Sequence, residues 1–147
     1  MDTKILDLMP DVASAATSAI QTMLDRHVGH AVTSTLRTLA EQQALFAQGR
    51  DLLATVNLLR AKAGMTPLAA VDNEYTVTNC DGVVNKSNHQ GGRALDIVPI
   101  NEQDLPVWPI FSDVRWEMIA TVMKEFGFTW GGDWTGTLID PPHYEMA

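Results

Sequence analysis

The chain has 147 residues, which fits one domain with a core of ordinary size. Ten Lys and Arg against eighteen Asp and Glu give a formal net charge of -8, which excludes binding to nucleic acid or to an anionic membrane by charge alone. No apolar run approaches the roughly 20 residues of a membrane span, and the first residues lack the basic and apolar stretches of a signal peptide. The single cysteine, Cys80, excludes an internal disulfide.

The first half of the chain has the apolar spacing of helices. Asp11 is a suitable N-cap for the first of them, and Gly29, Gly49 and Gly64 follow the three predicted helices. A short segment rich in Thr and Val separates the first helix from the second and predicts a strand. The predicted elements are helices at 11–27, 38–48 and 52–63 and a strand at 31–37.

The second half is richer in strand signals. Residues 79–90 are polar and contain glycine, which predicts a loop. Helices first and strands mainly later, without βαβ alternation, predict an α+β fold: one small domain over 1–147 with an antiparallel sheet flanked by helices. The predicted elements here are strands at 74–78, 93–100, 128–130 and 143–146 and a helix at 113–126.

Two histidines lie beside acidic residues and outside the predicted helices. His89 is in the loop, and Asp96 follows seven residues later on an apolar strand, where a carboxylate without a partner is costly to bury. A catalytic zinc ion takes three protein ligands, and His143 is suited to be the third. The spacing alone leaves two readings open: a zinc site, or a loop histidine and a C-terminal histidine bonded to backbone.

Asp140 lies three residues before His143, and two prolines between them restrict the backbone. A carboxylate beside a zinc ligand is suited to be the general base when water attacks a carbonyl. The developing oxyanion, or a substrate carboxylate, also needs a cation, and Arg37 or Arg50 would serve.

These residues resemble a known family. The segment Ser87-x-His89-x-x-Gly92-x-Ala94-x-Asp96 matches, at every fixed position, the zinc motif of the D-Ala-D-Ala carboxypeptidase and L-alanyl-D-glutamate endopeptidase metallopeptidases. These enzymes belong to the LAS group, named for lysostaphin, D-Ala-D-Ala peptidases and sonic hedgehog. Further matches lie at 37–50, 130–134 and 140–145, in the family's order, so the resemblance covers about 32–147.

The resemblance implies a role for each matched residue. His89, Asp96 and His143 would bind Zn2+, Asp140 would be the catalytic base and Arg37 would hold the substrate or the oxyanion. The same resemblance implies that Ser87 contacts the substrate backbone. Gln42 and Trp134 are further candidates for contact with the substrate. It also implies the family's small α+β domain, with the zinc on an antiparallel sheet.

Asp140 and the segment Trp130-Gly131-Gly132-Asp133-Trp134 are similar to the phage endolysin branch, whereas carboxypeptidase and dipeptidase branches tend to carry Glu where Asp140 stands. The resemblance therefore implies an endopeptidase that cuts the L-Ala-D-Glu bond of peptidoglycan stem peptides. A D-Ala-D-Ala carboxypeptidase or dipeptidase on the same scaffold, and an inactive zinc-holding module that binds cell wall, are the alternatives.

The expected partner is the peptidoglycan stem peptide, and we expect a monomer that binds no nucleic acid and inserts into no membrane. No wall-binding domain and no signal peptide are evident, so we expect a phage enzyme that stays in the host cytoplasm until a holin releases it to the cell wall.

Several other side chains have two readings. Cys80 is a nucleophile, a ligand or an inert thiol, and His27 with His30 is a metal pair or a solvated helix end. Glu145 either orients His143 or lies on the surface, and Trp134 either lines the substrate groove or packs.

Overall fold

The computed structural model describes residues 1–147, which form two compact units. The first unit consists of Met1 and Arg37–Gly91, and the second consists of Asp2–Leu36 and Gly92–Ala147. The expectation of one domain over the whole chain stays a prediction. None of the helices has the length and apolar character needed to cross a membrane.

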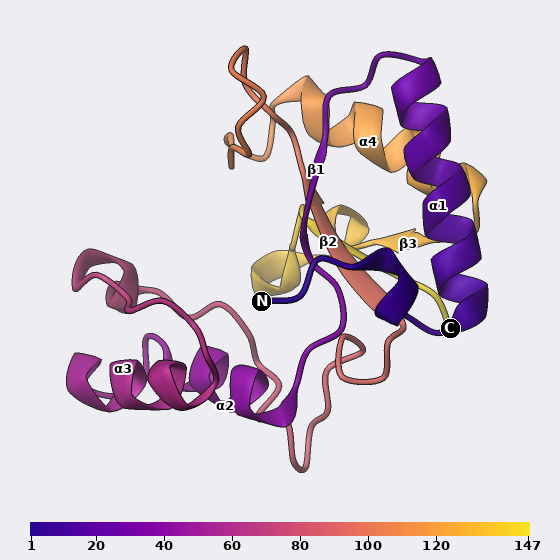
Figure 1. Ribbon diagram of the computed structural model, residues 1–147. Helices are drawn as coiled ribbons and strands as arrows, with labels where there is room; N and C mark the ends of the chain where they lie inside the picture. The colour runs from indigo at the N-terminus through magenta and orange to yellow at the C-terminus, as the bar shows by residue number, and fades with distance from the viewer. The chain divides into compact units, whose positions relative to one another are not determined.

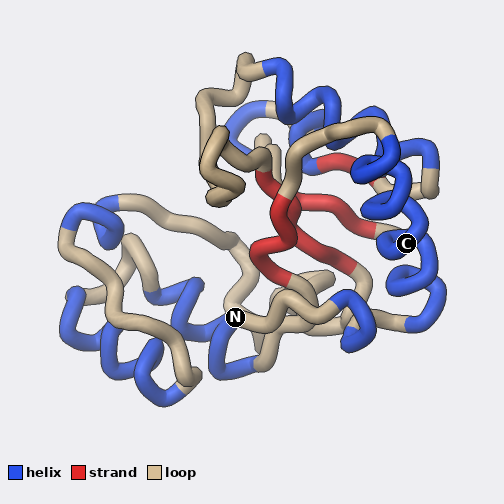
Figure 2. The backbone as a smooth tube through the Cα atoms, turned by 45° about the horizontal axis from the view of Figure 1, so that its top comes forward, coloured by secondary structure: helices blue, strands red, loops and turns tan.

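The second unit contains an antiparallel sheet of four strands in the order β1-β2-β4-β3. Figure 2 shows these strands in red within one layer. The two inner strands, β2 and β4, come from positions far apart in the sequence and pair directly. The bounds are β1 Ala31–Ser34, β2 Ala94–Val98, β3 Thr129–Trp130 and β4 His143–Glu145.

Two helices lie side by side against this sheet, α1 (Pro10–Asp25) and α4 (Val114–Glu125) (Figure 1). Proline at the first position of α1 loses no helical hydrogen bond. Asp113 caps α4, because its carboxylate accepts the backbone N–H of Arg115. The helices and the sheet enclose the main core, whose largest fully buried side chains include Met23, Leu95, Ile97, Trp116, Ile119, Met123, Trp130 and Tyr144.

The alternation of side chains along β2 and β4 positions the candidate site. Leu95, Ile97 and Tyr144 are fully buried in the core on one face of the sheet. Asp96 and His143 lie directly opposite each other in the strand register and therefore point away from that core. The sheet thus separates an apolar face from a face with ionisable groups.

The first unit contains the helices α2 (Leu39–Ala47) and α3 (Leu53–Lys62), which pack against each other. Thr38 begins α2 with a capping box, in which Thr38 accepts the backbone N–H of Glu41 and the Glu41 carboxylate accepts that of Thr38. The small core of this unit consists of Ala44, Leu45 and Met65, packed by Leu59 and Ala63.

The α+β prediction with an antiparallel sheet is confirmed, and every predicted helix is present within about two residues of its expected ends. The strand predicted at 74–78 is wrong. Val71–Glu74 is a short 3-10 helix, and Tyr75 and Val77, which supply the alternating apolar signal, are 66% and 50% exposed. The alternation is a local pattern, whereas a strand needs a partner strand, and none pairs with this segment.

Candidate metal centre and active site

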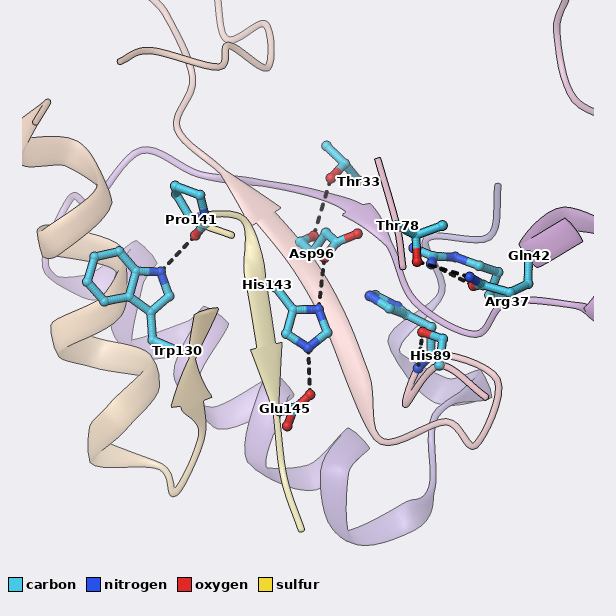
Figure 3. Close-up of polar contacts among 11 residues, drawn as sticks. Thr33, Arg37, Gln42, Thr78, His89, Asp96, Trp130, Pro141, His143 and Glu145 are labelled. Carbon is cyan, nitrogen blue, oxygen red and sulfur yellow. Dashed lines mark hydrogen bonds and ion pairs between the residues drawn. The ribbon is translucent and has the colours of Figure 1, made fainter. Parts of the chain in front are cut away.

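Asp96 and His143 form a pair in the middle of the sheet of the second unit. The Nδ1 atom of His143 lies 3.6 Å from the Oδ1 atom of Asp96, and the two side chains are 9% and 19% exposed, respectively (Figure 3). Their Cα atoms are register partners on neighbouring strands, so the backbone of both residues is held by the sheet. Two of the three predicted zinc ligands are therefore side by side.

The other nitrogen of His143 faces a second carboxylate. Its Nε2 atom lies 2.7 Å from the Oε2 atom of Glu145, as Figure 3 shows. Burial of His143 opposes the charged imidazolium, but the contacts with Asp96 and Glu145 and the charge of Asp140 outweigh burial and raise the pKa of His143 to about 9. This pocket favours a cation, whether the cation is a proton on the imidazole or a metal ion beside it.

Trp134 covers one side of the His143 ring. The two ring centroids are 5.1 Å apart and the ring planes are inclined by 43°. Trp134 is half-buried, so part of its indole is open to solvent. The structure thus places Trp134 where it both packs on a candidate ligand and presents an aromatic surface, and its contact with substrate stays a prediction.

The segment that carries Asp140 is held by the Trp-Gly-Gly motif. The backbone N–H of Asp140 donates to the carbonyl of Gly131 at 3.0 Å, and the N–H of His143 donates to the carbonyl of Asp140 at 3.1 Å. A Cβ atom on Gly131 would overlap the Asp140 carbonyl, so this close approach requires glycine.

Trp130 supports the same segment from its other side. Its indole N–H donates to the carbonyl of Pro141 at 2.7 Å (Figure 3), and a Cβ atom on Gly132 would overlap the indole ring. Both glycines of the motif are therefore explained by packing around the turn from Asp140 to His143.

His89 belongs to the first unit, where it is 2% exposed. It lies in a tight turn in which the hydroxyl of Ser87 accepts the backbone N–H of His89 at 3.3 Å. The carbonyl of His89 accepts the backbone N–H of Arg37 at 3.1 Å. Ser87 is thus bonded to the backbone of a predicted zinc ligand, and its predicted contact with substrate stays a prediction.

Arg37 is buried in the first unit beside Gln42. Its Nη1 atom donates to the Gln42 side-chain oxygen at 2.9 Å, and the Gln42 amide donates in turn to the Thr78 hydroxyl at 3.1 Å (Figure 3). The same amide also donates to the Cys80 carbonyl at 2.7 Å. Gln42 is fully buried, and both ends of its amide are bonded inside the protein. These contacts hold Gln42 and Arg37 against each other, and the predicted contact of Gln42 with substrate stays a prediction.

The remaining candidates have structural contacts. Arg50 stacks on the Phe46 ring at 4.1 Å and donates to the Phe46 carbonyl at 2.7 Å. His30 has its Nδ1 atom 2.9 Å from the carbonyl of Val28, and Cys80 is a half-buried free thiol. Thr78 was not singled out by sequence reasoning, because a hydroxyl that bonds a side chain 36 residues away leaves no local pattern.

Comparisons with known proteins agree with this arrangement. Residues 81–146, which carry all three predicted zinc ligands and Asp140, match the D-alanyl-D-alanine carboxypeptidase family. The chain is also 25% identical over 146 residues to the peptidoglycan L-alanyl-D-glutamate endopeptidase CwlK of Bacillus subtilis, covering 95% of this chain and 74% of CwlK. The chain is thus similar to this carboxypeptidase family over residues 81–146 and to CwlK over nearly its whole length.

Solved structures share the fold of this chain. The L-Ala D-Glu endopeptidase ChiX of Serratia marcescens matches with a TM-score of 0.57 and 20% identity, covering 97% of this chain and 83% of ChiX. A variant of the vancomycin-resistance D,D-pentapeptidase VanY, solved in complex with Zn(II), matches with a TM-score of 0.60 and 21% identity, covering 95% of this chain and 72% of VanY.

Proposed function

We propose that this chain is a LAS-type, zinc-dependent peptidoglycan hydrolase, and that it cuts the L-Ala-D-Glu bond of stem peptides. The observation that carries the proposal is the facing pair of Asp96 and His143 on the inner strands of the sheet, with the imidazole enclosed. CwlK and ChiX, both named as endopeptidases for this bond, support the choice of substrate.

The donor set fits zinc. His89, Asp96 and His143 offer two imidazole nitrogens and one carboxylate oxygen, one ligand atom each. Catalytic zinc sites use three protein ligands of these types and keep a position for water or substrate. When bound, zinc would supply a Lewis acid that polarises the scissile carbonyl and makes a water molecule easier to deprotonate.

Asp140 is the proposed general base. Its half-buried carboxylate acts electrostatically on the His143 imidazole, which places its charge near the candidate ligands. The bonds from Asp140 to Gly131 and from His143 to Asp140 fix its backbone, so the carboxylate needs little reorganisation to accept a proton. Asp140 would then pass that proton to the leaving amine.

Arg37 supplies the proposed positive charge for the oxyanion or a substrate carboxylate. Gln42 neutralises none of that charge, because it contacts the guanidinium with an amide oxygen rather than a carboxylate. The contact with Gln42 thus helps to orient the Arg37 guanidinium.

The biological setting is part of the proposal. The similarity of Asp140 and the Trp-Gly-Gly segment to the endolysin branch supports a phage or prophage lytic enzyme. The match of residues 81–146 to the D-alanyl-D-alanine carboxypeptidase family supports that activity as the second candidate. The monomeric state and the location in the host cytoplasm before release stay predictions.

A panel of synthetic stem peptides distinguishes the candidates. The purified protein is incubated with a pentapeptide that carries an acylated L-Ala and ends in D-Ala-D-Ala, and the products are identified by mass spectrometry. A tetrapeptide with a free N-terminal D-Glu supports the proposed bond. Release of terminal D-Ala instead assigns the carboxypeptidase activity and overturns the proposed bond.

A further inference from the structure

Glu145 lies next to the proposed zinc ligands without being one of them. We propose that Glu145 is a positioning residue: it accepts the Nε2 proton of His143 and so leaves Nδ1, the nitrogen that faces Asp96, free to bind a metal ion. This inference rests on the proposed zinc site, and it assigns a role to a side chain that has no part in the reaction itself.

The geometry of the contact supports a hydrogen bond of fixed direction. The distance of 2.7 Å between Nε2 and Oε2 is short for a nitrogen donor and is typical of a charged partner. The contact of the Nδ1 atom with the Oδ1 atom of Asp96 is longer, at 3.6 Å. The shorter contact favours a ring proton on Nε2, donated to Glu145, while Nδ1 faces Asp96.

The strand holds Glu145 in this place. His143 and Glu145 are two residues apart on β4, so their side chains share one face of the sheet. β4 is an inner strand, and the register partners of Glu145 are Ala94 on β2 and Thr129 on β3.

The ring itself has little freedom to turn. The His143 side chain is 9% exposed, and the Trp134 indole lies over it at 5.1 Å. Exchange of the two nitrogens would need the imidazole to rotate inside this enclosure and to break the contact with Glu145. A carboxylate that bonds the far nitrogen of a ligand histidine fixes its tautomer and raises its basicity as a ligand.

A purely structural ion pair is the competing role for Glu145, and it makes different predictions for the glutamine variant. Glu145→Gln keeps an oxygen acceptor for the Nε2 proton but removes the charge, whereas Glu145→Ala removes both. The exposed Glu102 lies outside this contact, so Glu102→Ala is a matched control for the change in net charge.

The test measures zinc affinity by competition with a chromophoric chelator, together with the ¹⁵N shifts of the His143 ring in the zinc-loaded protein. We expect Glu145→Ala to weaken zinc binding roughly 10- to 100-fold, Glu145→Gln to recover most of that loss, and Glu102→Ala to bind like the wild type. In the wild type we expect the shifts to show a proton on Nε2 and a metal ion on Nδ1.

Three outcomes would overturn the inference: unchanged zinc affinity in Glu145→Ala, equal losses in the alanine and glutamine variants, or a protonated Nδ1 in the zinc-loaded wild type. The ¹⁵N shifts of His143 in the zinc-loaded wild type test the inference even if Glu145→Ala does not fold. A wild-type protein that binds no zinc at all contradicts the proposed function itself, which separates the two failures.

Discussion

Burial lowers the pKa of His143 and the neighbouring carboxylates raise it, and the carboxylates together have the larger effect. The pKa of about 9 lies above the ordinary value of 6.5, so the metal-free imidazole is protonated at neutral pH. The contacts of this imidazolium stabilise the folded state fully below pH 6.5, and this stabilisation is lost as the pH rises toward 9.

We therefore predict that the metal-free wild type loses on the order of 3 kcal/mol of unfolding free energy through this group between about pH 6 and about pH 10. Urea unfolding in chelator measures the loss, and His143→Gln, which cannot titrate, is the comparison. An equal pH dependence in both proteins would show that His143 is not the group responsible.

Asp140 is proposed to act in catalysis without binding the metal, so its substitution affects hydrolysis and zinc content differently. We predict that Asp140→Ala keeps its zinc and loses hydrolysis by roughly 10²- to 10⁴-fold, because a general base contributes about that much. His143→Ala is expected to lose both. Metal content by elemental analysis and stem-peptide turnover are the measurements.

The control for Asp140→Ala is Asp133→Ala, which removes an exposed aspartate of the same region that pairs with Lys124. We expect this variant to keep most of its activity. Zinc loss in Asp140→Ala, or unimpaired hydrolysis, would make Asp140 something other than the base.

At the scale of elements, the site depends on how the Trp-Gly-Gly segment packs on the Asp140 turn. Gly131 and Gly136 belong to the same region, yet they are glycine for different reasons. Gly131 has no positive φ, and a side chain there would overlap the Asp140 carbonyl, whereas Gly136 has a φ of +63° and open space around it.

Gly131→Ala is accordingly predicted to displace Asp140 and abolish most hydrolysis, at a stability loss of roughly 2 kcal/mol from overpacking. Gly136→Ala is expected to cost about 1 kcal/mol through its backbone conformation and to keep its activity. Thermal unfolding and turnover of both variants test this, and similar activities in the two would refute the steric role of Gly131.

The elements differ in how well local patterns predict them. Helices α1 and α4 have a strong apolar stripe with a proline or aspartate at the start, so the spacing of their apolar residues is enough to predict them. The pairing of Asp96 with His143 joins strands 47 residues apart, and no local pattern encodes their register. The strand expected at 74–78 failed for the same reason, since its alternation has no partner.

The site residues were accessible from the sequence chiefly through the family motif. Spacing alone left a zinc site and two unrelated histidines as open readings, and the structure brings Asp96 and His143 together. The position of Gln42 behind Arg37 could not be predicted, because a buried amide and a substrate-binding amide look alike in sequence.

At the scale of the whole molecule, the proposed ligands come from segments far apart in the chain, so zinc binding and folding must be coupled. A ligand that binds only the folded state at about 1,000 times its Kd adds about 4 kcal/mol. For a chain of this size we predict that zinc raises the Tm by roughly 10 °C, and that His143→Ala shows no such shift in scanning calorimetry.

The protein is proposed to hydrolyse peptidoglycan only when it holds zinc. The most direct measurement incubates the purified protein with peptidoglycan, with a chelator, and with the chelator followed by excess zinc, and identifies the released ends by mass spectrometry. We predict new N-terminal D-Glu that disappears with the chelator and returns with zinc. Unchanged release of D-Glu in the chelator, or intact peptidoglycan with zinc bound, would contradict the account.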